Sequence, residues 1–193
     1  MSEIQGSLFD SWQVKEIEAA RYGSRPAEHH LSADSLRDWQ QRIVDWQQGV
    51  RREVAAPALD LFGNPLPGQL AEAIEPLTLV RRSLNFWRWP SDASGTAAIY
   101  FVIDYERELL LYVGETCKAD QRWKGEHDCK RYVASYQGLA NRLGVETAVA
   151  IAFWMDAPTR TRERQQLESD LIRRWRSPFN KENWRFWGTP FVH

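Results

Sequence analysis

The chain has 193 residues, of which 43% are hydrophobic and 26% are charged, and its formal net charge is −1. This composition is typical of a globular protein with a substantial core, and it excludes a disordered chain. The charge excludes a strongly basic protein that binds nucleic acid through net charge, so phosphate contacts would depend on local clusters of cations. We expect no membrane helix and no secretory signal. The two cysteines, Cys117 and Cys129, favour a reducing, cytoplasmic location over a disulfide scaffold.

A short peptide near the start of the chain contains Gln5 followed by Leu8 and Phe9. This spacing resembles the peptides by which bacterial replication and repair proteins bind the sliding clamp. Such peptides place two adjacent apolar side chains in a pocket, while the amide fixes the register. The resemblance implies the sliding clamp as a partner. The alternative left open is that Leu8 and Phe9 pack against the next helix.

Residues 34–54 predict an amphipathic helix, because apolar side chains recur at steps of three and four. The opposite face, which includes Gln47, is expected to be polar, and we interpret the helix as packing on the following domain. Residues 55–96 are rich in Pro and Gly and predict an irregular segment. We therefore expect an accessory segment at 1–95 and a second domain at 96–193. The expected apolar stripe consists of Leu36, Trp39, Ile43, Trp46, Val50 and Val54.

The second domain is predicted to begin with an antiparallel hairpin. Two runs of β-branched and aromatic residues, AIYFVI from Ala98 and LLLYVG from Leu109, flank a short charged turn. Each run carries a tyrosine, Tyr100 in the first and Tyr112 in the second. The second run ends at Gly114, where the backbone can turn sharply or approach another group closely.

Three further elements are expected after the hairpin. Residues 128–143 predict a helix, residues 147–155 a central third strand, and residues 161–176 an amphipathic helix. Together with the hairpin, these elements predict an α+β fold in which a small three-stranded antiparallel sheet is flanked by helices.

The hairpin tyrosines, Arg122 and two later motifs occur in an order that resembles the GIY-YIG endonuclease family. The two halves of the signature are spelled Ala98-Ile99-Tyr100 and Tyr112-Val113-Gly114, and the later motifs are Glu168-Ser169-Asp170-Leu171-Ile172 and Pro178-Phe179-Asn180. The resemblance covers residues 98–180, less than half of the chain. It implies a metal-dependent endonuclease that hydrolyses phosphodiester bonds in DNA with a single Mg²⁺ or Mn²⁺ ion.

The resemblance also implies a role for each matching residue. Glu168 would hold the ion, since a carboxylate is a hard oxygen ligand for a cation that keeps most of its waters. Arg122 would bind a phosphate oxygen bidentately. One hairpin tyrosine would help to take a proton from the attacking water, and the other would order water or phosphate; which does which is left open. Asn180 would tie the C-terminal tail to the site. His127 is a weaker candidate, because Glu126 stands where the family often has a histidine.

Cations near Arg122 predict a phosphate-binding patch next to the glycine turn. Its expected members are Gly114, Lys118, Lys124, Lys130 and Arg131. A zinc site formed by Cys117, His127 and Cys129 lacks a visible fourth ligand, so free thiols are favoured.

Two other functions stay open at this point. The chain could be a non-catalytic nucleic-acid-binding adaptor on a nuclease scaffold, or an RNA-cleaving nuclease. The clamp peptide favours a role associated with DNA repair or replication.

Overall fold

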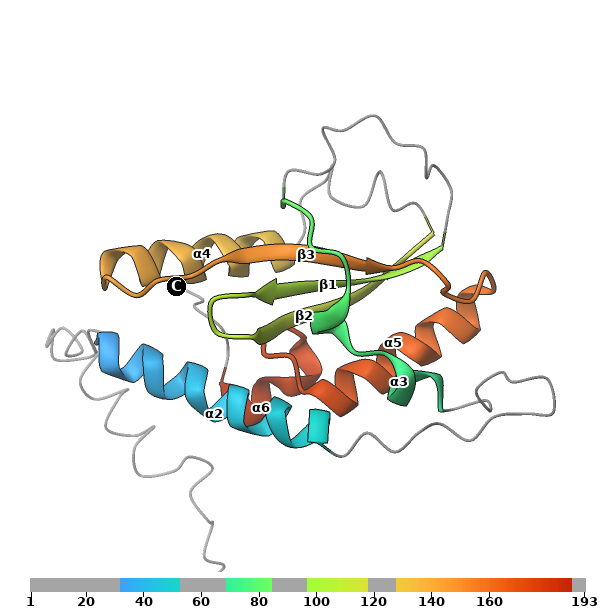
Figure 1. Ribbon diagram of the computed structural model, residues 1–193, viewed down its shortest axis with the longest axis horizontal. Coiled ribbons are helices and arrows are strands. Elements are labelled where there is room, and N and C mark those ends of the chain that lie inside the picture. Colours follow the sequence, from blue (N-terminus) through green and yellow to red (C-terminus); the bar gives the residue numbers. More distant parts are fainter. Residues whose placement is uncertain (1–31, 53–68, 85–96, 118–127, 189–193) are drawn as a thin grey trace, which may run out of the picture. The chain divides into compact units, whose positions relative to one another are not determined.

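The computed structural model describes residues 32–52, 69–84, 97–117 and 128–188. Residues 1–32 and 33–193 form two units, and every described helix and strand lies in the second. This unit has an α+β fold with a three-stranded antiparallel sheet flanked by helices, which confirms the predicted fold class (Figure 1). It includes the helix Ala33–Arg52, which the sequence assigned to the accessory segment with bounds 34–54; residues 53 and 54 lie outside the described residues. Among the described residues, no helix is both long and apolar enough to cross a bilayer.

The described elements follow one another in this order: α2 (Ala33–Arg52), α3 (Leu70–Ala73), η1 (Pro76–Thr78), β1 (Ala98–Asp104), β2 (Leu109–Thr116), α4 (Asp128–Arg142), β3 (Val149–Trp154), α5 (Thr161–Trp175), η3 (Lys181–Asn183) and α6 (Trp184–Trp187).

The central strand of the sheet is β1, because the strand order is β2-β1-β3. The prediction that the third strand is central is therefore wrong. An apolar sequence fits β3 because both of its faces are covered, with Ile151 in one core and Ala152 in the other. Its outer edge is also partly paired: Arg82 and Ile151 exchange two backbone hydrogen bonds of 2.8 and 3.0 Å.

Two hydrophobic cores lie on opposite faces of the sheet. Every residue of β1 is buried, and its side chains alternate between the two cores. Tyr100 and Val102 face α4, whereas Ile99, Phe101 and Ile103 face α5. Figure 1 shows α4 on one side of the sheet and α5 on the other.

A β-bulge in β2 decides which way its tyrosine points. Val102 pairs with Tyr112 and Ile103 pairs with Leu110, so Leu111 is the extra residue. As a result, Leu111 and Tyr112 both pack on the core beneath α4. A bulge interrupts the alternation of a strand, and here it brings Tyr112 to the same face as Tyr100.

Helix α2 packs along the outer edge of β2, and a buried glutamine joins them. The Gln47 amide nitrogen donates to the carbonyl of Leu110 at 3.0 Å, and its oxygen accepts from the N–H of Leu110 at 2.9 Å. The prediction that Gln47 belongs to a polar outer face is therefore wrong, since it is 1% exposed. The physical reason is that the backbone groups at a buried strand edge need partners.

A buried carboxylate fixes the hairpin turn against the rest of the sheet. Asp104 is fully buried and accepts hydrogen bonds from the Tyr136 hydroxyl at 2.7 Å and from the N–H of Ala148 at 2.8 Å. A third donor is the N–H of Glu106 at 3.1 Å. These bonds hold α4 in place over the tyrosine face, because Tyr136 belongs to that helix.

Gly114 makes room for a tyrosine ring. It lies opposite Tyr100 in the β1–β2 register, and a Cβ atom at this position would overlap the Tyr100 ring and hydroxyl. The missing side chain therefore allows the Tyr100 ring to lie across β2.

We expect Gly114→Ala to lower the free energy of unfolding by about 1–3 kcal/mol, the usual cost of overpacking a core. The matched control is Gly138→Ala in α4, where a Cβ atom meets nothing within 4 Å. Removing a helical glycine should raise stability by about 0.5–1 kcal/mol. Urea unfolding of both variants measures the two shifts, and shifts of the same sign would contradict the close contact with Tyr100.

Candidate active site

The two hairpin tyrosines form one unit. Their rings lie with centroids 5.9 Å apart and planes inclined by 30°, and their hydroxyls are joined by a hydrogen bond. Tyr100 is 1% exposed. Tyr112 is half-buried and lines a cavity of about 500 Å³. Of the two hairpin tyrosines, Tyr112 is thus the one that a ligand in the cavity would meet, and Tyr100 supports it from behind.

The environment of Tyr112 favours its neutral form. Burial is the largest cause that raises its pKa above the ordinary value, followed by the neighbouring Tyr100 and Cys129. The carboxylate of Glu168 raises the pKa further. The Tyr112 hydroxyl therefore keeps its proton at neutral pH.

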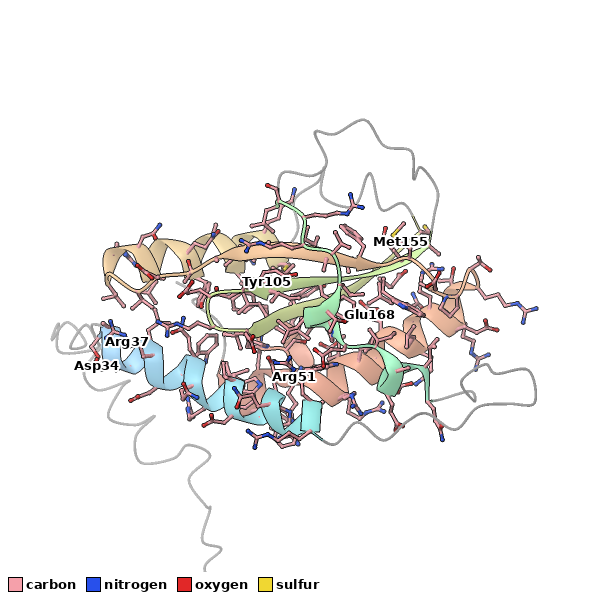
Figure 2. The ribbon with its side chains drawn as sticks, viewed as in Figure 1. Asp34, Arg37, Arg51, Tyr105, Met155 and Glu168 are labelled. Carbon is pink, nitrogen blue, oxygen red and sulfur yellow. The ribbon has the colours of Figure 1, made fainter. Side chains whose placement is uncertain are left out.

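Glu168 approaches the tyrosines around the edge of the sheet. It belongs to α5, which packs on the face opposite the tyrosines, and Figure 2 shows it between that helix and the sheet. Its Oε1 accepts a hydrogen bond of 3.1 Å from the N–H of Glu115 near the end of β2. Glu168 and Tyr112 line the same cavity. A carboxylate and a phenol from opposite faces thus meet at the outer edge of β2.

A buried ion pair fixes the end of β2 beside this carboxylate. The Arg164 Nε donates to the carboxylate of Glu115 at 2.6 Å, and Arg164 is only 2% exposed. Its Nη1 donates to the carbonyls of Pro158 and Thr159, each at 3.0 Å, and its Nη2 donates to the Thr161 hydroxyl at 3.5 Å. These bonds keep Arg164 buried and fix the position of Glu115 in β2. The N–H of Glu115 is the group that donates to Glu168.

Asn180 ties the chain after α5 to β2. Its amide oxygen accepts from the N–H of Val113 at 3.0 Å, and its amide nitrogen donates to the Val113 carbonyl at 2.9 Å. The Ser177 hydroxyl donates to the same amide oxygen at 2.6 Å. Both ends of the Asn180 amide are therefore engaged with protein groups, and the residue positions the tail instead of reacting.

The other residues selected from the sequence fall into two groups. Lys130 and Arg131 lie in the first turn of α4; Arg131 pairs with Asp128 at 3.0 Å, and within the described residues neither belongs to the cavity lining. The second group lies outside the described residues and consists of Gln5, Leu8, Phe9, Lys118, Arg122, Lys124 and His127.

The cavity lining also holds charged residues that were not selected from the sequence, among them an ion pair. Lys181 and Asp128 both line the cavity and form an ion pair of 2.8 Å. The hydrogen bond and the charge of Asp128 raise the pKa of Lys181, so its ammonium group stays charged. Lys181 directly follows Asn180, and this adjacency is the signal by which the sequence could have indicated it.

The side chains that line the cavity suit a metal ion that keeps most of its waters better than one coordinated mainly by protein ligands. In the part of the chain that the structure describes, no group of three or more His, Cys, Asp or Glu side chains could hold a metal ion. Glu168 lines about 500 Å³ of space together with two other acidic residues, Glu182 and Asp128, of which Asp128 is paired with Lys181. An ion with six waters needs roughly 180 Å³ at about 30 Å³ per water. A Mg²⁺ or Mn²⁺ ion that keeps most of its waters therefore suits this site.

Comparisons with known proteins leave the family unassigned. A scan against protein-family models found no match, and searches of curated proteins and of solved structures found none either. The function must therefore be argued from the geometry of the cavity and from the sequence motifs.

We expect the stability of the protein to fall as the pH rises above about 10, the ordinary pKa of tyrosine. Above that pH the unfolded chain loses its phenolic protons, whereas folded Tyr112 keeps its own. The unfolded state therefore binds fewer protons, and the free energy of unfolding has a negative slope against pH. Tyr112→Phe should make this slope shallower by up to about 1.4 kcal/mol per pH unit. Urea unfolding across the alkaline range measures it, and equal slopes for the two proteins would contradict the raised pKa.

Proposed function

We propose that this protein is a metal-dependent endonuclease that hydrolyses phosphodiester bonds in DNA. The observation that carries the proposal is that Tyr112 and Glu168 line one cavity, with Tyr100 bonded to Tyr112. Tyr100 and Tyr112 come from one hairpin and Glu168 from a helix much later in the chain, and the motifs assign all three to a single chemistry. Their convergence supports that chemistry.

Glu168 would hold the ion. Its hydrogen bond from Glu115 restrains the carboxylate, and a restrained ligand loses less freedom when it binds a cation. When bound, Mg²⁺ or Mn²⁺ would stabilise the negative charge that develops on the phosphate and on the leaving oxygen.

Tyr112 would orient the attacking water. The oxygen of a neutral phenol can accept a hydrogen bond from water. In the reaction, the water oxygen bonds to phosphorus as the bond between phosphorus and the 3′-oxygen breaks, and the water proton leaves through the hydrogen-bonded groups to solvent. Tyr100 would hold the Tyr112 ring at the angle that this step requires.

Lys181 would contribute a positive charge at the phosphate. It lines the cavity and is paired with the exposed carboxylate of Asp128, and an exposed ion pair is weak enough to be exchanged for a phosphate contact. Arg122 would act with it as the bidentate phosphate ligand that the resemblance implies.

We expect Glu168→Gln to keep the fold and to lose Mg²⁺-dependent nicking. The glutamine carbonyl can still accept the N–H of Glu115, but a neutral amide is a weaker ligand for a hard cation. The rate should fall by about 100-fold or more, the usual cost of removing one charge-stabilising group. Gel assays with plasmid, forked and four-way DNA in Mg²⁺ or Mn²⁺ measure the rate.

The control is Glu163→Gln, on the same helix. Glu163 is exposed and pairs with Arg160 at 3.2 Å, so this variant should cut like the wild type. If Glu168→Gln also cuts like the wild type, Glu168 is not part of the site. A wild-type protein that binds DNA without cutting it would favour the adaptor, and one that cuts only RNA would favour the RNA nuclease.

We further propose that Gln5, Leu8 and Phe9 bind the bacterial sliding clamp, which would direct the nuclease to replicating or repaired DNA. A peptide of residues 1–12 should bind the clamp in a fluorescence anisotropy titration. Combined Leu8→Ala and Phe9→Ala should weaken binding by at least about 30-fold, since the loss of even one buried anchor costs about 2 kcal/mol. Glu3→Ala is the control, and a wild-type peptide without affinity would end this proposal.

A further inference from the structure

A second cavity adjoins the candidate active site. It has a volume of about 370 Å³, and three residues line both cavities: Ser169, Ile172 and Glu182. The rest of its lining is dominated by cations next to an aromatic ring. We call it the arginine pocket, after Arg173, Arg176 and Arg185, which line it together with Phe186.

Aromatic rings hold the central arginine in place. The guanidinium carbon of Arg176 lies 3.6 Å from the ring centroid of Trp46 in α2 and 4.0 Å from that of Phe186 in α6. Arg185 stacks on Phe186 as well, at 4.7 Å. A guanidinium fixed between two rings loses little further freedom when it binds a ligand. The stack therefore presents a pre-positioned cation to the pocket.

The backbone around Arg176 is equally constrained. Arg176 follows the last turn of α5 in a left-handed conformation, with φ 46° and ψ 45°. Its N–H donates to the carbonyl of Ile172 at 3.0 Å, and its carbonyl accepts from the Trp187 indole at 2.6 Å. This turn directs the chain back along the helix, so that Arg176 and the α6 residues lie around the same pocket.

The charges of the arginine pocket are unbalanced. Glu182 is the acidic residue of its lining. Arg173 pairs with Asp170 at 2.9 Å, and its side chain is 74% exposed, so this pair is weak. In residues 32–52, 69–84, 97–117 and 128–188, no carboxylate forms an ion pair with Arg176 or Arg185. The pocket thus favours an anion, and a guanidinium is the side chain that binds phosphate with two parallel hydrogen bonds.

The spacing along α5 relates the pocket to the candidate site. Glu168 lies in α5, and Arg176 directly follows the last residue of this helix, about two turns further along the chain. Because the two cavities also share lining residues, a strand bound at Glu168 can continue into the arginine pocket.

We infer that the arginine pocket binds the phosphodiester backbone of the DNA strand on one side of the scissile phosphate. This inference rests on the proposed endonuclease function and extends it, because it gives the enzyme a second contact with the same strand. Arg176 and Arg185 are the phosphate ligands, and Phe186 with Trp46 keeps Arg176 in position.

The test measures DNA binding without cleavage. The full-length protein is titrated against fluorescein-labelled forked DNA in EDTA at several salt concentrations. Arg176→Gln and Arg185→Gln should each weaken binding and reduce the slope of log K against log salt by about 1, as expected for the loss of one phosphate contact. Arg185→Lys should keep the slope. The control, Arg162→Gln, removes an exposed arginine from the first turn of the same helix and should leave affinity and slope unchanged.

The length of the DNA gives a second readout. Shortening the strand stepwise on the side of the cleavage point that reaches the arginine pocket should remove the difference between the wild type and Arg185→Gln, since the phosphate contact is then lost in both. Shortening the other side should leave the difference intact.

The outcomes separate the two proposals. If the wild type cuts DNA but Arg185→Gln binds with unchanged affinity and slope, the arginine pocket is not a DNA contact and the endonuclease proposal stands. If Arg176→Gln lowers the melting temperature but leaves DNA binding unchanged, the stack only stabilises the fold and the inference is overturned. If Arg176→Gln does not fold, the result for Arg185→Gln decides between the two outcomes. If the wild type neither binds nor cuts DNA, both proposals fall.

Discussion

The outer edge of β2 is the constraint on which the rest of the structure depends. A strand at the edge of a sheet presents N–H and carbonyl groups that need hydrogen-bond partners once helices cover them. No fourth strand supplies these partners in the described residues. They come from α2, from α5 and from the segment after it. In order along β2, the residues that supply them are Gln47, Phe179, Asn180 and Glu168.

The same edge creates the candidate site. Tyr112 packs on the α4 face of the sheet, and Glu168 comes from the helix on the α5 face. A phenol and a carboxylate from opposite faces can meet only where the sheet ends. Glu168 both accepts a hydrogen bond from β2 and lines the cavity, so one side chain takes part in closing the edge and in forming the site. The bulge before Tyr112 completes this arrangement.

Sequence patterns predicted the hairpin and the main helices, because periodicity reports which side chains are buried. They could not order the strands: an apolar run indicates two covered faces, which β3 has although it lies at an edge. Gln47 was misjudged because a polar side chain is buried only when a particular backbone group needs it. Tyr112 and Glu168 were selected through motif spacing, whereas the pairing of Lys181 with Asp128 depends on tertiary contacts that no local pattern contains.

The glutamine and asparagine at the β2 edge bind peptide groups, which every amino acid carries. They are therefore insensitive to the side chains of the strand that they hold. Substitutions in β2 that the two cores accommodate therefore leave these backbone hydrogen bonds intact. A single inserted or deleted residue between Leu110 and Val113 would misalign both amides at once. We therefore expect substitutions in β2 to be tolerated far better than insertions or deletions.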